Sequence, residues 1–326
     1  MEVLVSEVGP RDGLQSVKQA MPTGHKIAWV RALAAAGLQE IEVGSFVNPA
    51  RLPQMADAAE VVRDAVTIDG LTVLALVPNL KGARRAAEAG VHKVTIPVSA
   101  SEQHSLANVN MTCEQAVEEV RRVCALRTEL DAGRSLGVEV GISTAFGCTL
   151  QGPISEDWVI ALAGRLVEVG VDSVGLSDGT GTANPAQVRR LFTRLNRELG
   201  DRAGGAHFHN TRGQGLANVV AALEAGVTTF DASLGGLGGC PYSPGATGNI
   251  VTEDLVWMLE AMGISTGIDL DRLMEARRIM EDGLPGQETY GYLAEVGTEK
   301  GFRYAGGPIA PEGTGRRQQP QPGATA

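Results

Sequence analysis

One short pattern recurs four times along the chain and constrains its fold more than any other feature. An Ala-rich or Val-rich helical stretch ends at a glycine, and a run of apolar and β-branched residues follows directly. The four copies are AAAGLQEIEV at 34–43, AEAGVHKVTI at 87–96, VEVGVDSVGL at 167–176 and LEAGVTTFDA at 223–232. A glycine suits the left-handed cap that ends a helix. Each copy therefore predicts a helix, a tight turn and a buried strand.

Four further apolar runs complete an alternating order of strands and helices. They lie at residues 2–8, 71–77, 138–144 and 206–209. Eight strand candidates separated by helical segments predict an α/β fold with a parallel sheet and helices outside it. Eight units over roughly 260 residues favour a (β/α)8 TIM barrel. An open doubly wound sheet would usually carry GxGxxG after its first strand, where this chain has GPRDG.

Two helical patterns extend the chain after the last strand, near residues 249–262 and 269–281. We therefore assign residues 1–290 to one catalytic barrel with extra C-terminal helices. Residues 291–326 are assigned to a C-terminal tail. Its final stretch, GGPIAPEGTGRRQQPQPGATA, is rich in Pro, Gly and Gln, a composition that predicts partial disorder.

Charge and composition exclude several classes of function. A formal net charge of -10 argues against nucleic acid or an anionic membrane as a partner. No apolar run is long enough to span a bilayer, and strand-like sequence from residue 2 argues against a signal peptide. The cysteines, at positions 113, 124, 148 and 240, show no paired spacing for a metal or a disulfide framework. We expect a cytoplasmic protein.

Polar residues cluster where the predicted strands end. In a (β/α)8 barrel the active site lies at the carboxyl ends of the strands. Candidates from distant parts of the chain fall at these ends: Arg11, Asp12, Glu42, Asp178, His207 and His209. The topology therefore predicts that these groups meet at one rim.

The sharpest local signal is His207-Phe208-His209 at the end of the seventh strand. Residues two apart on a strand point to the same face, so both imidazoles face one point. Asp12 follows the first strand, two positions away around a closed barrel, and can reach the same point. Such a set suits Mg²⁺ or Mn²⁺, with Zn²⁺, Co²⁺ and Fe²⁺ as alternatives. The other interpretation is a pair of ordinary polar histidines.

A glycine-rich loop, GGLGGCPYSPGATGN at 235–249, follows the eighth strand. Its small residues predict a loop that moves and brings Cys240 or the backbone close to a ligand. A flexible connector with a buried cysteine is the alternative. Asn249 closes the loop, where its side chain can cap the next helix or reach the metal.

These motifs resemble a known family. VGPRDGLQ, IEVGSFV, VPNLKG, HFHNTRGQGLANV and GLGGCPYSPGATGN occur in this order over about residues 2–290. The chain resembles the 3-hydroxy-3-methylglutaryl-CoA lyase family, within the metal-dependent barrel enzymes that cleave or form carbon–carbon bonds next to a thioester. The resemblance implies a lyase that converts 3-hydroxy-3-methylglutaryl-CoA, or a close analogue, to acetyl-CoA and a keto acid. It also implies an acyl-CoA partner and a homodimer or higher homo-oligomer.

The resemblance also implies residue roles. A divalent metal, Mg²⁺ or Mn²⁺, would be held by Asp12, His207, His209 and Asn249. Arg11 would bind the thioester oxygen and stabilise the enolate that forms on it. Cys240 would assist proton transfer and Glu42 would support the site, so that the catalytic set is Arg11, Cys240, Glu42, Asp12 and His207. The substrate-binding set is Arg11, Gln15, Ser45 and Asp178.

Five positions depart from the usual pattern of this family. They are Gly175, Ser177, Phe208, Asn210 and Arg212, where the family usually has Ser, Gly, Cys, Asp and Tyr. We expect these positions to lie near the acyl end of the substrate. These departures leave the identity of the acyl group undetermined, so a citramalyl-CoA-type lyase is an alternative.

Three other functions compete with that of a lyase. A related acyl-CoA condensing synthase gains support from HxHN, but such enzymes generally lack the GGCP loop and carry a C-terminal extension. A degenerate barrel used as a scaffold would have lost metal ligands, and all four are present. A two-histidine, one-carboxylate iron oxygenase usually has a β-sandwich fold.

Overall fold

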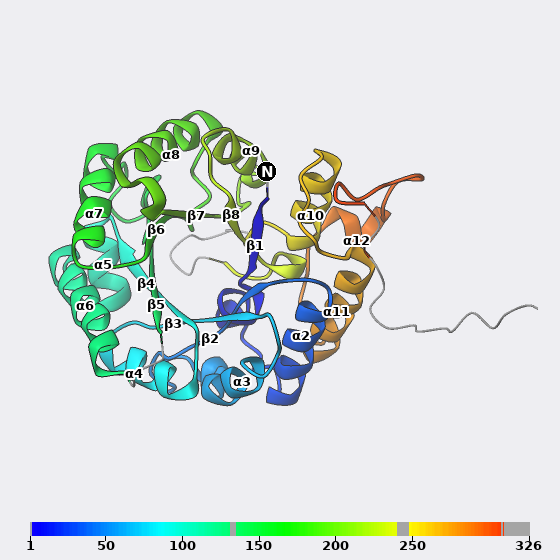
Figure 1. The fold of residues 1–326 in the computed structure, drawn as a ribbon, viewed down its shortest axis with the longest axis horizontal. Helices are drawn as coiled ribbons and strands as arrows, with labels where there is room; N and C mark the ends of the chain where they lie inside the picture. Colours follow the sequence, from blue (N-terminus) through cyan, green and yellow to red (C-terminus); the bar gives the residue numbers. More distant parts are fainter. Residues whose placement is uncertain (1, 131–134, 240–247, 308, 310–326) are drawn as a thin grey trace, which may run out of the picture.

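Eight parallel strands form a closed barrel in sequence order, and helices surround it (Figure 1). The structure, a computed structural model, describes residues 2–130, 135–239, 248–307 and 309. The strands are β1 (Leu4–Glu7), β2 (Glu40–Ser45), β3 (Thr72–Leu76), β4 (Lys93–Ser99), β5 (Gly137–Ser143), β6 (Ser173–Asp178), β7 (Ala203–Phe208) and β8 (Thr229–Ala232). Each overlaps a predicted strand, so the (β/α)8 barrel is confirmed.

Helices follow the strands around the outside of the barrel (Figure 1). They are α1 (Leu14–Ser16), α2 (Thr23–Ala35), α3 (Ala58–Ala65), α4 (Leu80–Ala89), α5 (Glu102–Val109), α6 (Cys113–Ala125), α7 (Glu156–Glu168), α8 (Pro185–Leu199), α9 (Gly215–Glu224), α10 (Thr252–Ala261), α11 (Leu270–Gly283) and α12 (Tyr292–Val296). Shorter turns are the π-helical η1 (Gly9–Gly13) and the 3₁₀ turns η2 (Pro53–Met55), η3 (Leu126–Glu129), η4 (Gly200–Arg202) and η5 (Leu234–Gly236).

The four repeated glycines end their helices as predicted. Gly37, Gly90, Gly170 and Gly226 have φ values of 104°, 102°, 104° and 92°. This left-handed conformation strains any residue with a Cβ. The glycines therefore let the chain turn at once from each helix into the next strand.

The main hydrophobic core lies between the strands and the helices. On β5, Val138, Val140 and Ile142 face outward and are at most 2% exposed. The alternate residues Glu139 and Gly141 face the barrel interior and line a cavity there. Because side chains alternate along a strand, the outer face supplies stability and the inner face is available for other groups.

The extra C-terminal helices α10 and α11 are confirmed. Figure 1 shows α10 beside β1, α11 beside α2, and α12 beside α10. Arg277 of α11 forms an ion pair with the fully buried Glu253 of α10 and donates to the carbonyl of Tyr290 at 2.6 Å. The backbone N–H of Leu293 donates to Asp254 at 2.8 Å. These bonds hold residues 290–293 against α10. Most of the final stretch predicted to be partly disordered, residues 306–326, lies outside the described residues.

Within the described ranges, no helix combines the length and apolar character needed to cross a bilayer.

A buried carboxyl group joins both ends of the barrel sequence. Glu7 ends β1, and its Oε1 accepts from the N–H groups of Gly9 at 2.8 Å and Leu234 at 3.0 Å. Its Oε2 accepts from the hydroxyl of Thr252 at 2.7 Å. Burial raises the pKa of Glu7 to about 7, although these three donors lower it.

We expect Glu7→Gln to change how stability depends on pH. Because the pKa of Glu7 lies above its ordinary value of 4.5, the folded chain holds this proton more tightly than the unfolded chain. The contribution of Glu7 to the free energy of unfolding is complete below about pH 4.5 and falls as the pH rises through about 7. The fall is about 1.4 kcal/mol per pKa unit.

Urea unfolding of both proteins between about pH 4.5 and about pH 8 measures this effect. The stability of the wild type relative to Glu7→Gln should decrease as the pH rises. Glu2→Gln, at an exposed position just before β1, is the matched control and should show no such trend. A pH-independent difference between wild type and Glu7→Gln would contradict the prediction.

Candidate active site

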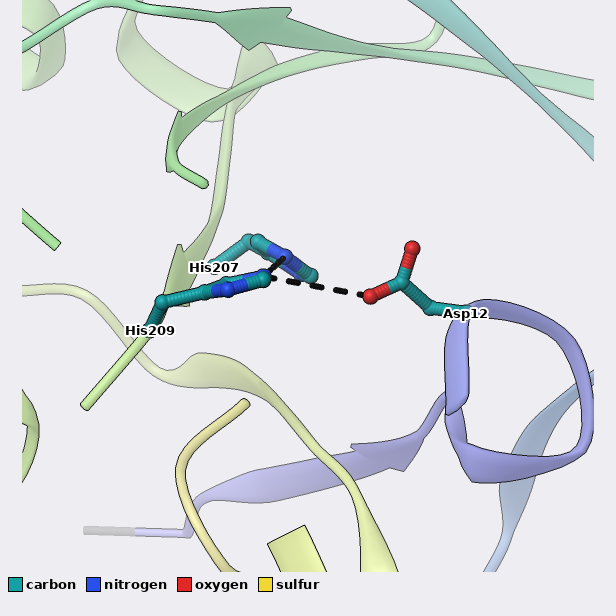
Figure 2. Close-up of side chains that lie close together, drawn as sticks. All are labelled: Asp12, His207 and His209. Atoms are coloured by element: carbon teal, nitrogen blue, oxygen red, sulfur yellow. Dashed lines mark hydrogen bonds and ion pairs between the residues drawn. The ribbon is translucent and has the colours of Figure 1, made fainter. Parts of the chain in front are cut away.

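Asp12, His207 and His209 face one another at the barrel mouth (Figure 2). The Nε2 atoms of His207 and His209 are 3.1 Å apart, and Nε2 of His209 lies 3.9 Å from Oδ2 of Asp12. One ligand atom from each of the three lies within 4.8 Å of the others. The predicted same-face arrangement of the two histidines is confirmed.

The turn after β1 positions the carboxylate. In η1 the carbonyl of Val8 accepts from the N–H groups of Asp12 at 2.7 Å and Arg11 at 3.1 Å, so the chain winds tightly. A Cβ on Gly9 would lie 2.5 Å from Oε1 of Glu7, which explains the glycine. The GPRDG motif therefore builds a tight turn that carries two opposite charges to the rim.

Asn249 contacts the same carboxylate. Its Nδ2 donates to Oδ2 of Asp12 at 2.7 Å and to the carbonyl of Leu237 at 3.1 Å. Its Oδ1 is buried and has no hydrogen-bond partner within the described part of the chain. A buried amide oxygen beside a carboxylate and two imidazoles suits a divalent cation, because all four groups offer lone pairs.

The sequence analysis missed Asp231, the carboxylate that orients His207. Oδ2 of Asp231, on β8, lies 3.0 Å from Nδ1 of His207. A hydrogen on Nδ1 leaves the Nε2 lone pair directed at the rim. Burial alone would lower the pKa of His207, but the hydrogen bond and charge of Asp231 raise it above its ordinary value. No signal in the local sequence points to Asp231, because its place opposite His207 depends on the register of β7 and β8.

Arg11 is held between two carboxylates. Its Nη1 lies 2.5 Å from Oδ1 of Asp12, and its guanidinium also pairs with Glu42, which is 1% exposed. Glu42 accepts a further bond from Thr95. Burial would raise the pKa of Asp12, but Arg11 and the two histidines lower it well below its ordinary range. Asp12 is therefore ionised at neutral pH.

The three other candidates for substrate binding lie in different surroundings. Gln15 lines the cavity, with its Nε2 3.5 Å from Oδ1 of Asp12. Ser45 is buried, and its hydroxyl has no hydrogen-bond partner within the described residues. The carboxylate of Asp178 accepts from the N–H groups of Thr182 at 3.0 Å and Ala183 at 2.8 Å. Asp178 therefore orders the loop after β6, and the substrate-binding roles stay predictions.

The departures from the family pattern separate into two groups. Gly175 and Ser177 line the cavity, as expected. The expectation for Phe208 is wrong: its side chain is fully buried on the outer face of β7, with its ring centroid 6.3 Å from that of Phe192 on α8. His207 faces inward, so its neighbour must face outward.

Asn210 and Arg212 also have structural contacts. Oδ1 of Asn210 accepts from the N–H of Gly215 at 3.0 Å, at the start of α9. Arg212 donates to the carbonyls of Thr180 at 3.2 Å and Gly181 at 2.9 Å. Both residues therefore hold loops together, and their place near the acyl end of the substrate stays a prediction. Cys240 and the loop residues 241–247 lie outside the described residues.

The residues at the rim line one large cavity of about 1290 Å³. It extends from the barrel interior to the mouth, where Asn48, Arg51 and Lys81 form part of its wall. Drug-sized ligands usually occupy about 300–1,000 Å³. The cavity therefore has room for an elongated ligand, with cationic groups at its outer end.

The fold and rim define a class, a (β/α)8 barrel with two histidines and a carboxylate at the carboxyl ends of its strands. Comparison with known proteins gives the family. The family model described as HMGL-like matches residues 2–280. Hydroxymethylglutaryl-CoA lyase YngG of Bacillus subtilis is 40% identical over 282 residues, which cover 86% of this chain and 93% of that protein. The chain belongs to the HMGL-like family, and the resemblance noted in its motifs is confirmed.

Two further relatives bear on the substrate. The 3-hydroxy-3-isohexenylglutaryl-CoA/hydroxy-methylglutaryl-CoA lyase of Pseudomonas aeruginosa is 42% identical over 277 residues, 84% of this chain and 90% of that protein. An HMG-CoA lyase of Acinetobacter baumannii, solved in complex with coenzyme A and 3-methylmalate, superposes with a TM-score of 0.84. It is 41% identical, and the match covers 91% of this chain and 95% of that chain.

We expect Asp231→Asn to weaken divalent-metal binding by about tenfold or more, the scale seen when a carboxylate behind a histidine ligand is lost. The amide carries no charge, so it holds the Nδ1 hydrogen of His207 less firmly. Calorimetric titration of the substrate-free protein with Mn²⁺ measures the affinity. Asp201→Asn, at an exposed position, is the control. Equal Mn²⁺ affinity in all three proteins would contradict the orienting role.

Proposed function

We propose that the protein is a divalent-metal-dependent carbon–carbon lyase that cleaves 3-hydroxy-3-methylglutaryl-CoA, or a close analogue, to acetyl-CoA and a keto acid. The observation that carries the proposal is the convergence of Asp12, His207 and His209 beside Arg11 in a chain of this family. The names of its relatives and the coenzyme A bound to one of them support it.

Asp12, His207, His209 and Asn249 would hold the metal, Mg²⁺ or Mn²⁺. The metal would supply Lewis-acid chemistry to the substrate oxygens beside it. The contacts of Asn249 and Asp231 with Asp12 and His207 fix the directions of these donors before any ligand binds. Preorganised donors lose little free energy to reorganisation when the reaction occurs.

Arg11 would bind the thioester oxygen. In the proposed step the 3-hydroxyl loses its proton to a base at the rim, C3 becomes a ketone, and the C2–C3 bond breaks. Its electron pair forms the enolate of acetyl-CoA, with negative charge on the thioester oxygen. Arg11, held by Glu42, presents its positive charge there. Protonation of C2, which we assign to Cys240, then completes acetyl-CoA.

The cavity mouth supports an acyl-CoA partner. Arg51 and Lys81 lie at this end of the cavity, and cationic side chains bind phosphate groups of the kind that coenzyme A carries. The location in the cytoplasm and a homodimer or higher homo-oligomer remain predictions. A condensing synthase stays the alternative function; the side chain of Asn210, which follows the second histidine, contacts the start of α9.

The direct test is incubation of the purified protein with 3-hydroxy-3-methylglutaryl-CoA and Mg²⁺ or Mn²⁺. We expect acetyl-CoA and acetoacetate by mass spectrometry, and their loss on chelation of the metal. Citramalyl-CoA in a parallel reaction tests the alternative lyase. Absence of acetyl-CoA from both substrates with both metals would contradict the proposal.

We expect Arg11→Met to lower kcat by about a hundredfold or more, the scale for losing a donor to an oxyanion. The change removes the charge that faces the developing enolate and keeps most of the side-chain volume. Steady-state kinetics measures it, with circular dichroism as the check on folding. Arg31→Met, half-exposed on the outer helix α2, should have near-normal kcat. Near-normal turnover of Arg11→Met would show that the pair is structural.

A further inference from the structure

The inside of this barrel is lined by small and polar residues. Barrels of this fold are usually filled by layers of Val, Ile and Leu. Here β3 supplies Leu74 and Leu76, but the inward residues of the other strands are mainly hydroxyl-bearing, acidic or glycine. Those on the cavity wall below the rim are Ser6, Glu40, Thr95, Glu139, Gly141, Ser173, Gly175, Gly205 and Thr229. The cavity at the rim therefore continues into the barrel.

Gly141 on β5 contributes most clearly to this space. A Cβ built on Gly141 would meet no atom within 4 Å, and its backbone is not in the left-handed region. Gly175 differs, because a Cβ there would lie 2.6 Å from the carbonyl oxygen of Gly205 on the next strand. The close approach of β6 and β7 explains Gly175, whereas the glycine at 141 leaves the cavity open.

An ionic cluster forms the floor of the cavity. Nζ of Lys93 lies 2.8 Å from Oε2 of Glu40 and 3.1 Å from Oε1 of Glu139. A smaller cavity of about 190 Å³ shares Glu40 and Glu139 with the large one and continues to the lower end of the barrel. The floor thus combines two carboxyl groups with one ammonium group. It therefore suits a ligand that donates hydrogen bonds and disfavours a second carboxylate.

Three hydroxyl groups line the cavity between the rim and the floor, those of Ser6, Ser173 and Thr229. Ser6 is 2% exposed, and Ser173 and Thr229 are half-buried. All three residues therefore lie where a ligand in the cavity can reach them. A ligand that displaces water from these hydroxyls without replacing its hydrogen bonds loses free energy, whereas a polar ligand group restores those bonds. The wall and the floor thus favour the same chemistry in a ligand.

We propose that the barrel interior binds an extended, hydroxylated substituent on C3 of the acyl-CoA. The inference rests on the proposed lyase function, which places the reacting carbon at the rim. Thr229 lies two residues below Asp231 on β8, about 7 Å deeper at the strand rise. A methyl group would leave this depth unfilled. A long apolar chain would fill it but displace water from Ser6, Ser173 and Thr229 without replacing its hydrogen bonds.

The test compares three substrates that differ only at C3, with a methyl group, a six-carbon alkyl chain or the same chain with a terminal hydroxyl. We expect kcat/KM for the hydroxylated chain to exceed both others by about tenfold or more, since a site that hydrogen-bonds a hydroxyl discriminates strongly against its absence. Calorimetry with the matching 3-deoxy acyl-CoAs, which cannot be cleaved, should give the same order of affinity in the wild type.

The variant Gly141→Leu tests whether the substituent on C3 binds within the barrel. The added side chain would fill the open space, so the ratio of kcat/KM for the hydroxylated chain to that for the methyl compound should fall by about a hundredfold or more. Gly164→Leu is the matched control. Its Cβ also meets nothing within 4 Å, but it lies on the outer helix α7, so the ratio should stay as in the wild type.

Each outcome decides a separate point. Cleavage of the methyl compound in preference to the hydroxylated chain overturns the inference and leaves the lyase function standing. An equal preference for the alkyl and hydroxylated chains overturns the polar character of the site. Cleavage of none of the three contradicts the proposed function, and the 3-deoxy compounds then test the interior site alone. An unchanged ratio in Gly141→Leu shows that the substituent does not bind inside the barrel. If that variant fails to fold, the order of affinities of the wild type for the 3-deoxy compounds decides the inference.

Discussion

Closure of the barrel by β1 and β8 is the constraint on which the rest of the structure depends. The register pairs Leu4 with Thr229 and Glu7 with Ala232, so the first strand of the chain lies beside the last. This pairing brings Asp12 to His207, nearly two hundred positions along the chain. The buried carboxyl of Glu7 reinforces the same junction through Leu234. Without closure of the barrel, Asp12 and His207 would not lie side by side at the rim.

The charges at the rim follow from their burial. An ion removed from water requires a partner, and here each ion has one. Arg11 lies between Asp12 and Glu42, and His207 faces Asp231. These pairs determine which groups are ionised before any ligand arrives. They also direct the lone pairs of the rim histidines and the positive charge of Arg11 to different parts of the site. The proposed reaction needs both.

Much of the fold was predictable because its signals are local. A glycine such as Gly90 adopts a positive φ that other residues avoid, so its place after a helical stretch marks the end of that helix. This local pattern was enough to predict all four repeated units. The pairing of His207 with His209 followed from strand periodicity alone. The same periodicity should have placed Phe208 on the outer face. Asp231 could not be singled out, because its role depends on register across β7 and β8, which local sequence does not specify.

The interior could not be predicted, because a strand sequence does not reveal how its inner face is filled. Stability in this chain comes from the outer faces of the strands, where residues such as Val140 and Ile142 pack against helices. The inner faces then need not form a core and can carry Glu139 or Gly141. Polar groups inside a barrel lose hydration, and Lys93 recovers part of this loss by pairing with both floor carboxylates. The hydroxyls of Ser6, Ser173 and Thr229 line the path from the rim to the floor, where they contribute little to the packing of the fold and stay accessible to a ligand.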